Sequence, residues 1–267
     1  MNSKINVITL FSGYESQCMA LDRLKNHFPN FDYELIYWSE IDENAIKAHN
    51  AVYPQYKDRN LGDITKIDFS ALANKDIDLL TYSFPCTTIS NSGKQEGFEK
   101  GSGTASSLLW YVEDAIKYIR PKYLLMENVK ALVQSKFIGL FREWCSIVES
   151  YGYYNFSEVL NATDFEVPQN RERVFMVSIL KESDLLPPPQ YYFPKKMSLH
   201  RRIKDILETD VDDSFYLSDK ALEYFCRVNN DKSHCHNFTP KDGEDVAFTV
   251  RCASGQRVDD NFLKYEE

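Results

Sequence analysis

The chain has 267 residues and a formal net charge of −9, and 43% of its residues are hydrophobic. This length suffices for one α/β domain and a smaller second region, and the composition excludes a disordered chain. Because proteins that bind nucleic acid by themselves are usually basic, the acidic balance argues against a simple DNA-binding module. The composition does not exclude an enzyme that has a local basic cleft.

Composition also limits the compartment and the partners. No run of 18 apolar residues occurs, so we expect no membrane span, and the N-terminal residues show no signal peptide. Six cysteines without framework spacing indicate reduced thiols and a cytoplasmic protein. Residues 233–236 (Ser-His-Cys-His) come nearest to a metal motif, but nearby cysteines have no recognised spacing, and we expect no metal site.

Strands and helices alternate along the first 180 residues. Apolar and β-branched runs predict strands at residues 4–11, 34–39, 79–84, 123–129, 154–161 and 173–180. Amphipathic periods predict helices at residues 17–28, 42–51, 107–119 and 137–151. In the first helix, Met19, Leu21 and Leu24 are expected to face inward. This alternation predicts an α/β fold.

The first turn and the tip of the second strand suggest a nucleotide-cofactor site. Gly13 follows the first strand and lets the backbone approach a ligand closely, and Glu40 ends the second strand, where a ribose hydroxyl is often held. One glycine is less than a glycine-rich fingerprint. An ordinary βα turn, and a charge at a helix N-terminus, explain these two residues equally well.

The residue at the end of the third expected strand is Cys86. The run 79–84 stops where Pro85 cannot extend a strand, and ligands of open α/β sheets lie at the carboxyl ends of strands. A polar segment without an apolar period follows at 91–107. Cys86 is therefore either a reactive thiol beside a loop or a small buried hydrophobic residue, and this stretch alone supports the two interpretations equally.

Polar side chains also flank the last two strands. Glu127 and Asn128 follow an apolar run, and because such groups are costly to bury unpaired, they lie at the sheet edge or take part in chemistry. Arg171 and Arg173 are two residues apart, and alternate residues of an extended segment share a face. The two arginines can thus face one ligand, or they belong to a solvated turn.

A proline-rich segment divides the chain. Residues 183–197 include three consecutive prolines and predict a stiff linker. We expect one domain at 1–182 and a smaller region at 198–267. In that region Ser198 is expected to cap a short helix that ends near Leu207.

Six motifs occur in a fixed order between residue 5 and about residue 180. They are Phe11-Ser12-Gly13, Glu40, Gly62-Asp63-Ile64, Phe84-Pro85-Cys86, Glu127-Asn128-Val129 and Gln169-Asn170-Arg171-Glu172-Arg173. Single motifs such as Pro-Cys are weak signals, but the ordered set is specific, and it resembles the motifs of cytosine-C5 DNA methyltransferases. This resemblance favours the nucleophile over the buried hydrophobic residue at Cys86.

The resemblance implies methyl transfer to C5 of cytosine in double-stranded DNA. Cys86 would add to C6 of a base flipped out of the duplex, because the target cannot be reached inside it. Glu127 would bond N3 and hold the exocyclic amine, Arg173 would hold O2, and Arg171 would support the site or contact a phosphate. The loop 87–106 would close over the base.

The cofactor implied by the resemblance is S-adenosylmethionine. The implied fold is a Rossmann-like S-adenosylmethionine-dependent methyltransferase sheet, mostly parallel with an antiparallel closing strand, plus a small incomplete C-terminal region. Glu40 would hold the cofactor ribose. The full set of expected cofactor contacts is Phe11, Gly13, Glu40, Ile41, Asp63, Ile64, Pro85 and Leu108.

Three features depart from the family pattern. The cofactor turn continues with Tyr14, Glu15 and Ser16 where the family usually has further glycines, and Thr87 stands where Gln commonly follows the cysteine. The family's full target-recognition region and its closing segment do not follow before residue 267, so residues 198–267 are expected to be a partial target-recognition region.

These departures leave alternatives open. A second subunit could supply recognition and the missing cofactor-pocket motif, or the chain could be a fragment of a longer enzyme. A non-catalytic relative that binds DNA or a partner, and an RNA cytosine-C5 methyltransferase, are the remaining readings.

Overall fold

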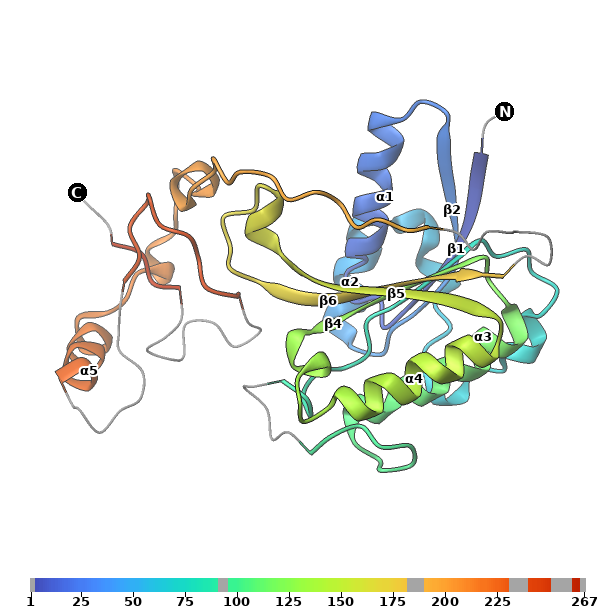
Figure 1. Cartoon of the computed structure of the whole chain (residues 1–267). Coiled ribbons are helices and arrows are strands. Elements are labelled where there is room, and N and C mark those ends of the chain that lie inside the picture. The colour runs from blue at the N-terminus through green and yellow to red at the C-terminus, as the bar shows by residue number, and fades with distance from the viewer. Residues whose placement is uncertain (1–2, 91–95, 182–189, 231–239, 251–260, 265–267) are drawn as a thin grey trace. The chain divides into compact units, whose positions relative to one another are not determined.

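The computed structural model describes residues 3–90, 96–181, 190–230, 240–250 and 261–264. These residues form two compact units (Figure 1). The first unit consists of Met1–Val159 and Arg173–Phe193, and the second of Leu160–Glu172 and Pro194–Glu267. The metal motif considered at residues 233–236 lies outside the described residues.

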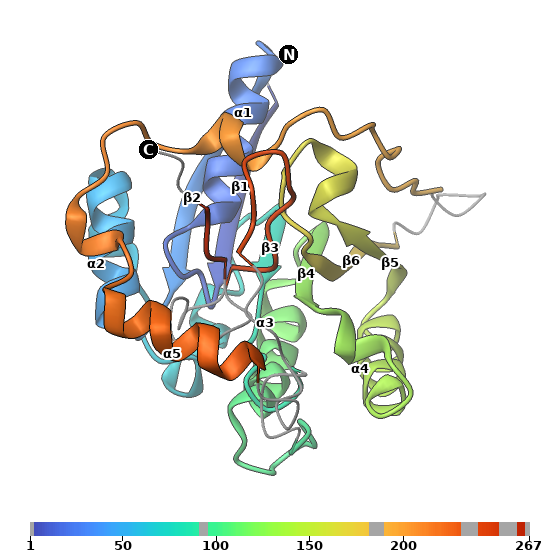
Figure 2. The same cartoon turned by 90° about the vertical axis from the view of Figure 1, so that its left-hand side faces the viewer.

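A six-stranded sheet forms the centre of the first unit, with strand order β2-β1-β3-β4-β6-β5 (Figure 2). The strands are β1 (Ser3–Leu10), β2 (Phe31–Ser39), β3 (Leu79–Tyr82), β4 (Tyr123–Val129), β5 (Tyr153–Asn161) and β6 (Glu172–Leu180). The pairs β1–β2, β1–β3 and β3–β4 are parallel, whereas β6 runs antiparallel to β4. The expected α/β fold, with a mostly parallel sheet and an antiparallel strand, is confirmed.

Helices cover both faces of this sheet, with α3 and α4 together on one face and α1 on the other (Figure 1). The α-helices of the whole chain are α1 (Ser16–His27), α2 (Glu43–Val52), α3 (Val112–Ile119), α4 (Ile138–Ser150) and α5 (Asp219–Asn230). Asp42 begins α2, because its carboxylate accepts the N–H groups of Asn44 and Ala45 at 3.0 and 2.8 Å.

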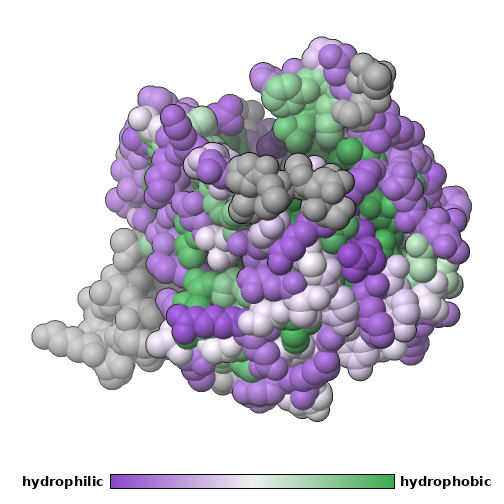
Figure 3. All heavy atoms as spheres, turned by 45° about the vertical axis from the view of Figure 1, so that its right-hand side comes forward, coloured by the Kyte–Doolittle hydropathy of each residue, from purple (hydrophilic) through white to green (hydrophobic). Residues whose placement is uncertain are grey.

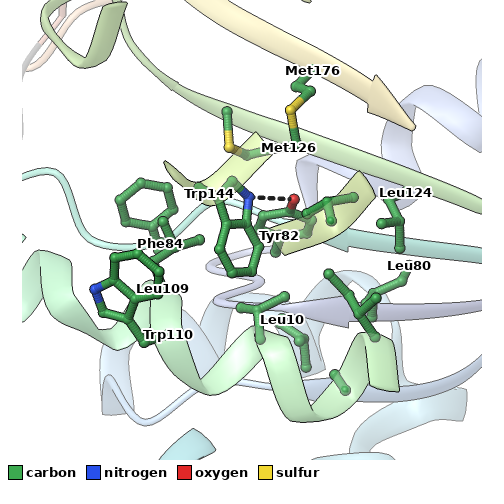
Figure 4. Close-up of a cluster of buried hydrophobic side chains, with 14 of the residues drawn as sticks. Leu10, Leu80, Tyr82, Phe84, Leu109, Trp110, Leu124, Met126, Trp144 and Met176 are labelled. Carbon is green, nitrogen blue, oxygen red and sulfur yellow. Dashed lines mark hydrogen bonds between the residues drawn. The ribbon is translucent and has the colours of Figure 1, made fainter. Parts of the chain in front are cut away.

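Two hydrophobic cores follow from the alternation of side chains along the strands. Val7 packs with Leu21 of α1 in the smaller core, and its neighbour Ile8 belongs to the larger core. In the larger core, Trp144 of α4 is fully buried and donates its indole N–H to the hydroxyl of Tyr82 on β3, at 3.1 Å (Figure 4). This bond satisfies two polar groups that would otherwise be costly to bury.

Two expected elements of the first unit are shorter in the structure. β3 ends at Tyr82 rather than at residue 84, because β1 ends at its pairing partner Leu10. Only the second half of the expected helix at 107–119 is α-helical, since Ala105–Tyr111 forms a tighter 3₁₀ helix. There the Trp110 indole N–H reaches back to the Phe98 carbonyl at 2.5 Å.

Two further expectations were wrong in detail. Leu24 was expected to face inward but is 42% exposed, because it lies in the last turn of α1, beyond the buried positions Cys18 and Leu21. The helix expected at 198–207 is only a 3₁₀ turn at Ile203–Ile206. Upstream of that turn, the N–H groups of His200 and Arg201 bond the Glu166 carboxylate and not a helix carbonyl.

The face seen in Figure 3 is covered mostly by hydrophilic side chains, with apolar ones in small areas between them. Within the described ranges, every helix is too short or too polar to cross a membrane.

Candidate active site

The carboxyl ends of four strands meet at one edge of the sheet. Leu10, the last residue of β1, pairs with Ser39 at the end of β2 and with Tyr82 at the end of β3. Tyr82 in turn pairs with Met126 near the end of β4. The segments that follow these strands therefore begin at this shared edge, where ligands of open α/β sheets lie.

Cys86 lies in the turn that follows β3. Its side chain is half-buried and packs against the larger core, and it forms no disulfide. Its carbonyl accepts the N–H groups of Ile89 and Ser90 at 3.1 and 2.8 Å. These bonds make the backbone after Cys86 a tight turn, while the side chain keeps part of its surface exposed.

Asn128 links the tip of β4 to the segment that carries Cys86. Its side chain is 3% exposed, and its amide donates to the carbonyl of Phe84 at 2.9 Å. Its other atom, Oδ1, accepts the N–H of Val129 at 2.8 Å. One buried side chain thus fixes the position of both strand ends relative to each other.

Glu127 and Arg173 form an ion pair at the same edge. The Nε atom of Arg173 lies 3.1 Å from Oε1 of Glu127, and the side chains are 16% and 27% exposed. The pair forms because β6 runs antiparallel to β4 and opposes Val129 with Arg173. The contact orients both groups and leaves each partly accessible.

Arg171 belongs to the second unit. Its Nη1 lies 3.5 Å from the carbonyl of Val250, and its backbone N–H donates to Oδ1 of Asn161 at 3.0 Å. The two arginines were expected to face one ligand. Because Arg173 belongs to the first unit, that expectation stays a prediction.

Thr88 anchors both ends of the segment that follows Cys86. Its hydroxyl donates to the carbonyl of Gly97 at 2.8 Å, and its carbonyl accepts the N–H of Gly97 at 3.0 Å. The N–H of Ser106 also bonds the Thr88 hydroxyl, at 3.3 Å. Residues 91–95 of the loop expected to close over the base lie outside the described residues.

The turn after β1 is tied to the tip of β2. Phe11 and Gly13 both have positive φ angles, of 56° and 58°. The N–H of Gly13 donates to Oε2 of Glu40 at 2.9 Å. Oε1 of Glu40 accepts the N–H groups of Ile41 and Asp42 at 2.8 and 2.9 Å. The carboxylate therefore joins the two segments expected to hold the cofactor.

This arrangement fits a nucleoside. A carboxylate has about four acceptor positions, and the three backbone bonds to Glu40 leave one for a ribose hydroxyl. Beside it, Ile41 is apolar and 65% exposed, so it offers a surface on which an adenine ring can pack. The structure thus brings Gly13, Glu40 and Ile41 together, and their contact with a cofactor stays a prediction.

The remaining expected cofactor contacts lie on neighbouring segments. The N–H of Thr65 bonds the Asp63 carboxylate at 3.0 Å and lowers the pKa of that group. Ile64 is buried in the larger core, and Leu108 and Pro85 are half-buried. Contact of these four side chains with a cofactor stays a prediction.

Sequence reasoning missed Asn60. Its Oδ1 accepts the N–H groups of Glu40 and Gly62 at 3.2 and 2.9 Å, and its amide donates to the Glu40 carbonyl at 3.1 Å. Asn60 therefore supports the backbone of Glu40 from the next segment. The available signal was an Asn two residues before a Gly, which is typical of a turn.

In the described part of the chain, no group of three or more His, Cys, Asp or Glu side chains could hold a metal ion.

Comparisons with known proteins show the family to which the chain belongs. The family model of the C-5 cytosine-specific DNA methylases matches residues 5–257. Type II methyltransferase M2.ScrFI of Lactococcus lactis subsp. cremoris is 46% identical over 164 residues, which are 61% of this chain and 44% of the relative. Orphan methyltransferase M.SssI of Spiroplasma monobiae is 46% identical over 156 residues, 57% of this chain and 40% of the relative.

A longer match is orphan methyltransferase M.Rho11sI of Bacillus phage rho11s, 31% identical over 245 residues, or 82% of this chain and 46% of the relative. The matched parts thus span less than half the length of these three relatives. Among solved structures, the crystal structure of S. pombe Dnmt2 methyltransferase has a TM-score of 0.64 at 18% identity, and the match covers 91% of this chain and 69% of that one. That likeness shows the fold. Because the family model matches residues 5–257 of the 267 residues of this chain, the chain belongs to the C-5 cytosine-specific DNA methylases.

Proposed function

We propose that this chain transfers a methyl group from S-adenosylmethionine to C5 of cytosine in double-stranded DNA, in the cytoplasm. The observation that carries the proposal is the ion pair between Glu127 and Arg173, at the sheet edge where the turn with Cys86 begins. Three groups of the kinds that this reaction needs thus lie at one edge of the sheet, with Glu127 near the end of β4, Arg173 at the start of the antiparallel β6, and Cys86 in the turn after β3. Family membership supports the same reaction.

Cys86 is the proposed nucleophile. Its thiolate adds to C6 of the cytosine ring, and the electron pair of the 5,6 double bond becomes available at C5. Once C5 carries the methyl group, the C5 proton passes to a water molecule, its electron pair restores the 5,6 double bond, and the Cys86 sulfur leaves C6 as the thiolate. The cytosine must leave the stack for this attack, at a cost of a few kcal/mol.

Glu127 and Arg173 are proposed to hold the base. The carboxyl group of Glu127 donates a proton to N3 and accepts an N–H of the exocyclic amine, so that negative charge developing in the ring is balanced by a proton at N3. The guanidinium of Arg173 donates to O2 and orients the carboxylate through their ion pair. Arg171 is assigned a supporting or phosphate contact.

The cofactor is proposed to lie against the turn after β1, with Glu40 on the ribose and Ile41 beside the adenine. When bound, S-adenosylmethionine supplies an electrophilic methyl group. The cofactor would lie against Phe11 and Gly13, with Pro85 and Leu108 near its methionine end and Asp63 and Ile64 near its adenine. The acceptor position left on Glu40 supports this assignment.

A methyl-transfer assay tests the proposal. The whole chain is incubated with labelled S-adenosylmethionine and duplex DNA, and the label on DNA is counted. We expect transfer by the wild-type chain and none by Cys86→Ser. Cys145→Ser is the matched control, because Cys145 of α4 lies outside the site, and it should keep the activity. Equal transfer by Cys86→Ser and the wild type would contradict the assigned nucleophile.

Two further arms define the substrate and the partner. Duplex DNA and transfer RNA compete in the same assay, and we expect the label to go to DNA. A second polypeptide that supplies target recognition is tested by adding the product of a neighbouring open reading frame. No transfer in either condition, together with no cofactor binding, would contradict the enzyme assignment and favour a non-catalytic relative.

A further inference from the structure

A carboxyl group is buried beneath the cofactor turn. Glu15 precedes α1 with φ of 73° and ψ of 47°, a left-handed conformation that side chains other than glycine rarely adopt. Its side chain is fully buried. A strained residue with a buried acidic group persists only where its surroundings hold it firmly, and such residues cluster at functional sites.

One side chain of β1 and one of α2 lie next to this carboxyl group. The hydroxyl of Thr9 on β1 donates to Oε2 of Glu15 at 2.9 Å. Nε2 of His49 on α2 lies 3.7 Å from the same oxygen, and the His49 ring stacks on Trp38 with centroids 3.7 Å apart. In the described structure, Oε1 of Glu15 and Nε2 of His49 have no hydrogen-bond partner.

The same residue also closes the turn through its backbone. The N–H of Glu15 donates to the Ser12 carbonyl at 2.9 Å, and the N–H of Ser12 donates to the Ser39 carbonyl at 3.1 Å. Gly13, between them, is held by Glu40. The turn is therefore fixed from β2 on one side and from Thr9 and His49 below.

We propose that Glu15 is a positioning residue for the cofactor, whose side chain, anchored by Thr9 and facing His49, fixes the turn that presents Gly13 and Glu40 to S-adenosylmethionine. This inference rests on the proposed function. In this inference, the buried carboxyl group of Glu15 stiffens the cofactor turn, which has no further glycine after Gly13. A turn held in its bound form loses less freedom on binding, so the anchor increases affinity without touching the ligand.

The pH dependence of the affinity for S-adenosylmethionine distinguishes this positioning role from a purely structural one, because it depends on the charge on Glu15. Burial raises the pKa of Glu15 to about 7, and burial lowers the pKa of His49. The other titratable groups that act on Glu15 are Cys18 of its own helix and Glu40. Because an ionised Glu15 attracts the cationic sulfonium group and a neutral one does not, affinity should rise as pH increases through the Glu15 pKa.

Calorimetric titration of the whole chain with S-adenosylmethionine tests this inference. We expect Glu15→Ala to weaken binding by about tenfold or more. Glu15→Gln keeps the shape of the side chain, and its affinity should lack the change that the wild type shows between about pH 6 and about pH 8. Since the amino group of the ligand titrates in this range too, the readout is the difference between the two proteins.

Tyr153→Phe is the matched control. It removes a buried hydroxyl that bonds the carbonyl of Pro121 at 2.7 Å, in the larger core and away from the turn, and should leave the affinity unchanged. Should Glu15→Ala fail to fold, as judged by circular dichroism, Glu15→Gln and Thr9→Val carry the test. A Glu15→Gln variant with the wild-type affinity and pH profile would overturn the inference. A wild-type chain that binds no S-adenosylmethionine would instead overturn the proposed function.

Discussion

The buried amide of Asn128 offers a direct test of how the site is assembled. Replacing Asn128 by Ala removes the bond to the Phe84 carbonyl and the bond to the Val129 N–H. A hydrogen bond contributes about 1 kcal/mol net, and a buried polar group left without a partner costs about 1–3 kcal/mol. We therefore expect Asn128→Ala to lower the free energy of unfolding by about 2–4 kcal/mol.

Urea unfolding followed by tryptophan fluorescence measures this loss, because all three tryptophans of the chain are buried in the first unit. Asn128→Asp separates the two bonds, since it keeps an acceptor for Val129 but replaces the amide donor to Phe84 by an oxygen. We expect both variants to lose more methyl transfer than their stability explains, because Phe84 precedes Cys86 by two residues.

Asn155→Ala is the control for the loss of an asparagine side chain. Its amide donates to the Cys145 carbonyl at 2.9 Å and so joins β5 to α4, away from the strand edge. It should lower stability and leave methyl transfer intact in the folded protein. An unfolding free energy of Asn128→Ala within about 0.5 kcal/mol of the wild-type value would refute the reasoning.

Three further predictions follow from buried or strained positions. Burial raises the pKa of Glu15 from 4.5 to about 7. The folded protein therefore keeps a proton that the unfolded chain releases, and stability should fall by about 3 kcal/mol as pH rises across this interval. Urea unfolding at several pH values should show this fall in the wild type and not in Glu15→Gln. Trp144→Phe removes the donor to Tyr82 and part of a buried ring, so its urea midpoint should reflect a loss of about 2–3 kcal/mol; an unchanged midpoint would contradict the packing. Gly13→Ala meets no atom within 4 Å but is strained by its φ of +58°. Stability should fall by only about 1 kcal/mol, while calorimetry should show an affinity for S-adenosylmethionine at least about tenfold weaker; an unaltered affinity would argue against a cofactor at this turn.

Much of the fold was predictable because apolar runs mark buried strands. β4 has the bounds that its sequence indicates, and the strand–helix alternation predicted the mostly parallel sheet. The end of β3 was not predictable, because it depends on where its neighbour β1 ends at Leu10. The exposure of Leu24 likewise depends on how far α1 extends past the sheet, which its own period does not record.

The candidate site was predictable where residues lie at strand ends and match family motifs. The ordered motifs named Glu127 and Arg173, and the antiparallel pairing of β6 with β4 explains why the two meet. The burial of Glu15 could not be read from the sequence, because its neighbour His49 lies 34 residues away on another helix. An acidic residue in a turn is usually solvated, so the local sequence predicts an exposed side chain at Glu15, whereas the structure buries it.

Covalent trapping of the whole chain tests the central claim most directly. The protein is incubated with duplex DNA that contains 5-fluorocytosine, together with S-adenosylmethionine, and its mass is measured. Because fluorine at C5 cannot leave as the proton does, the thiolate of Cys86 should stay bonded to C6, and the mass should increase by that of the DNA and one methyl group. The increase should be absent in Cys86→Ser and present in Cys145→Ser. The same adduct on Cys86→Ser, or none on a wild-type chain that methylates DNA, would contradict the account.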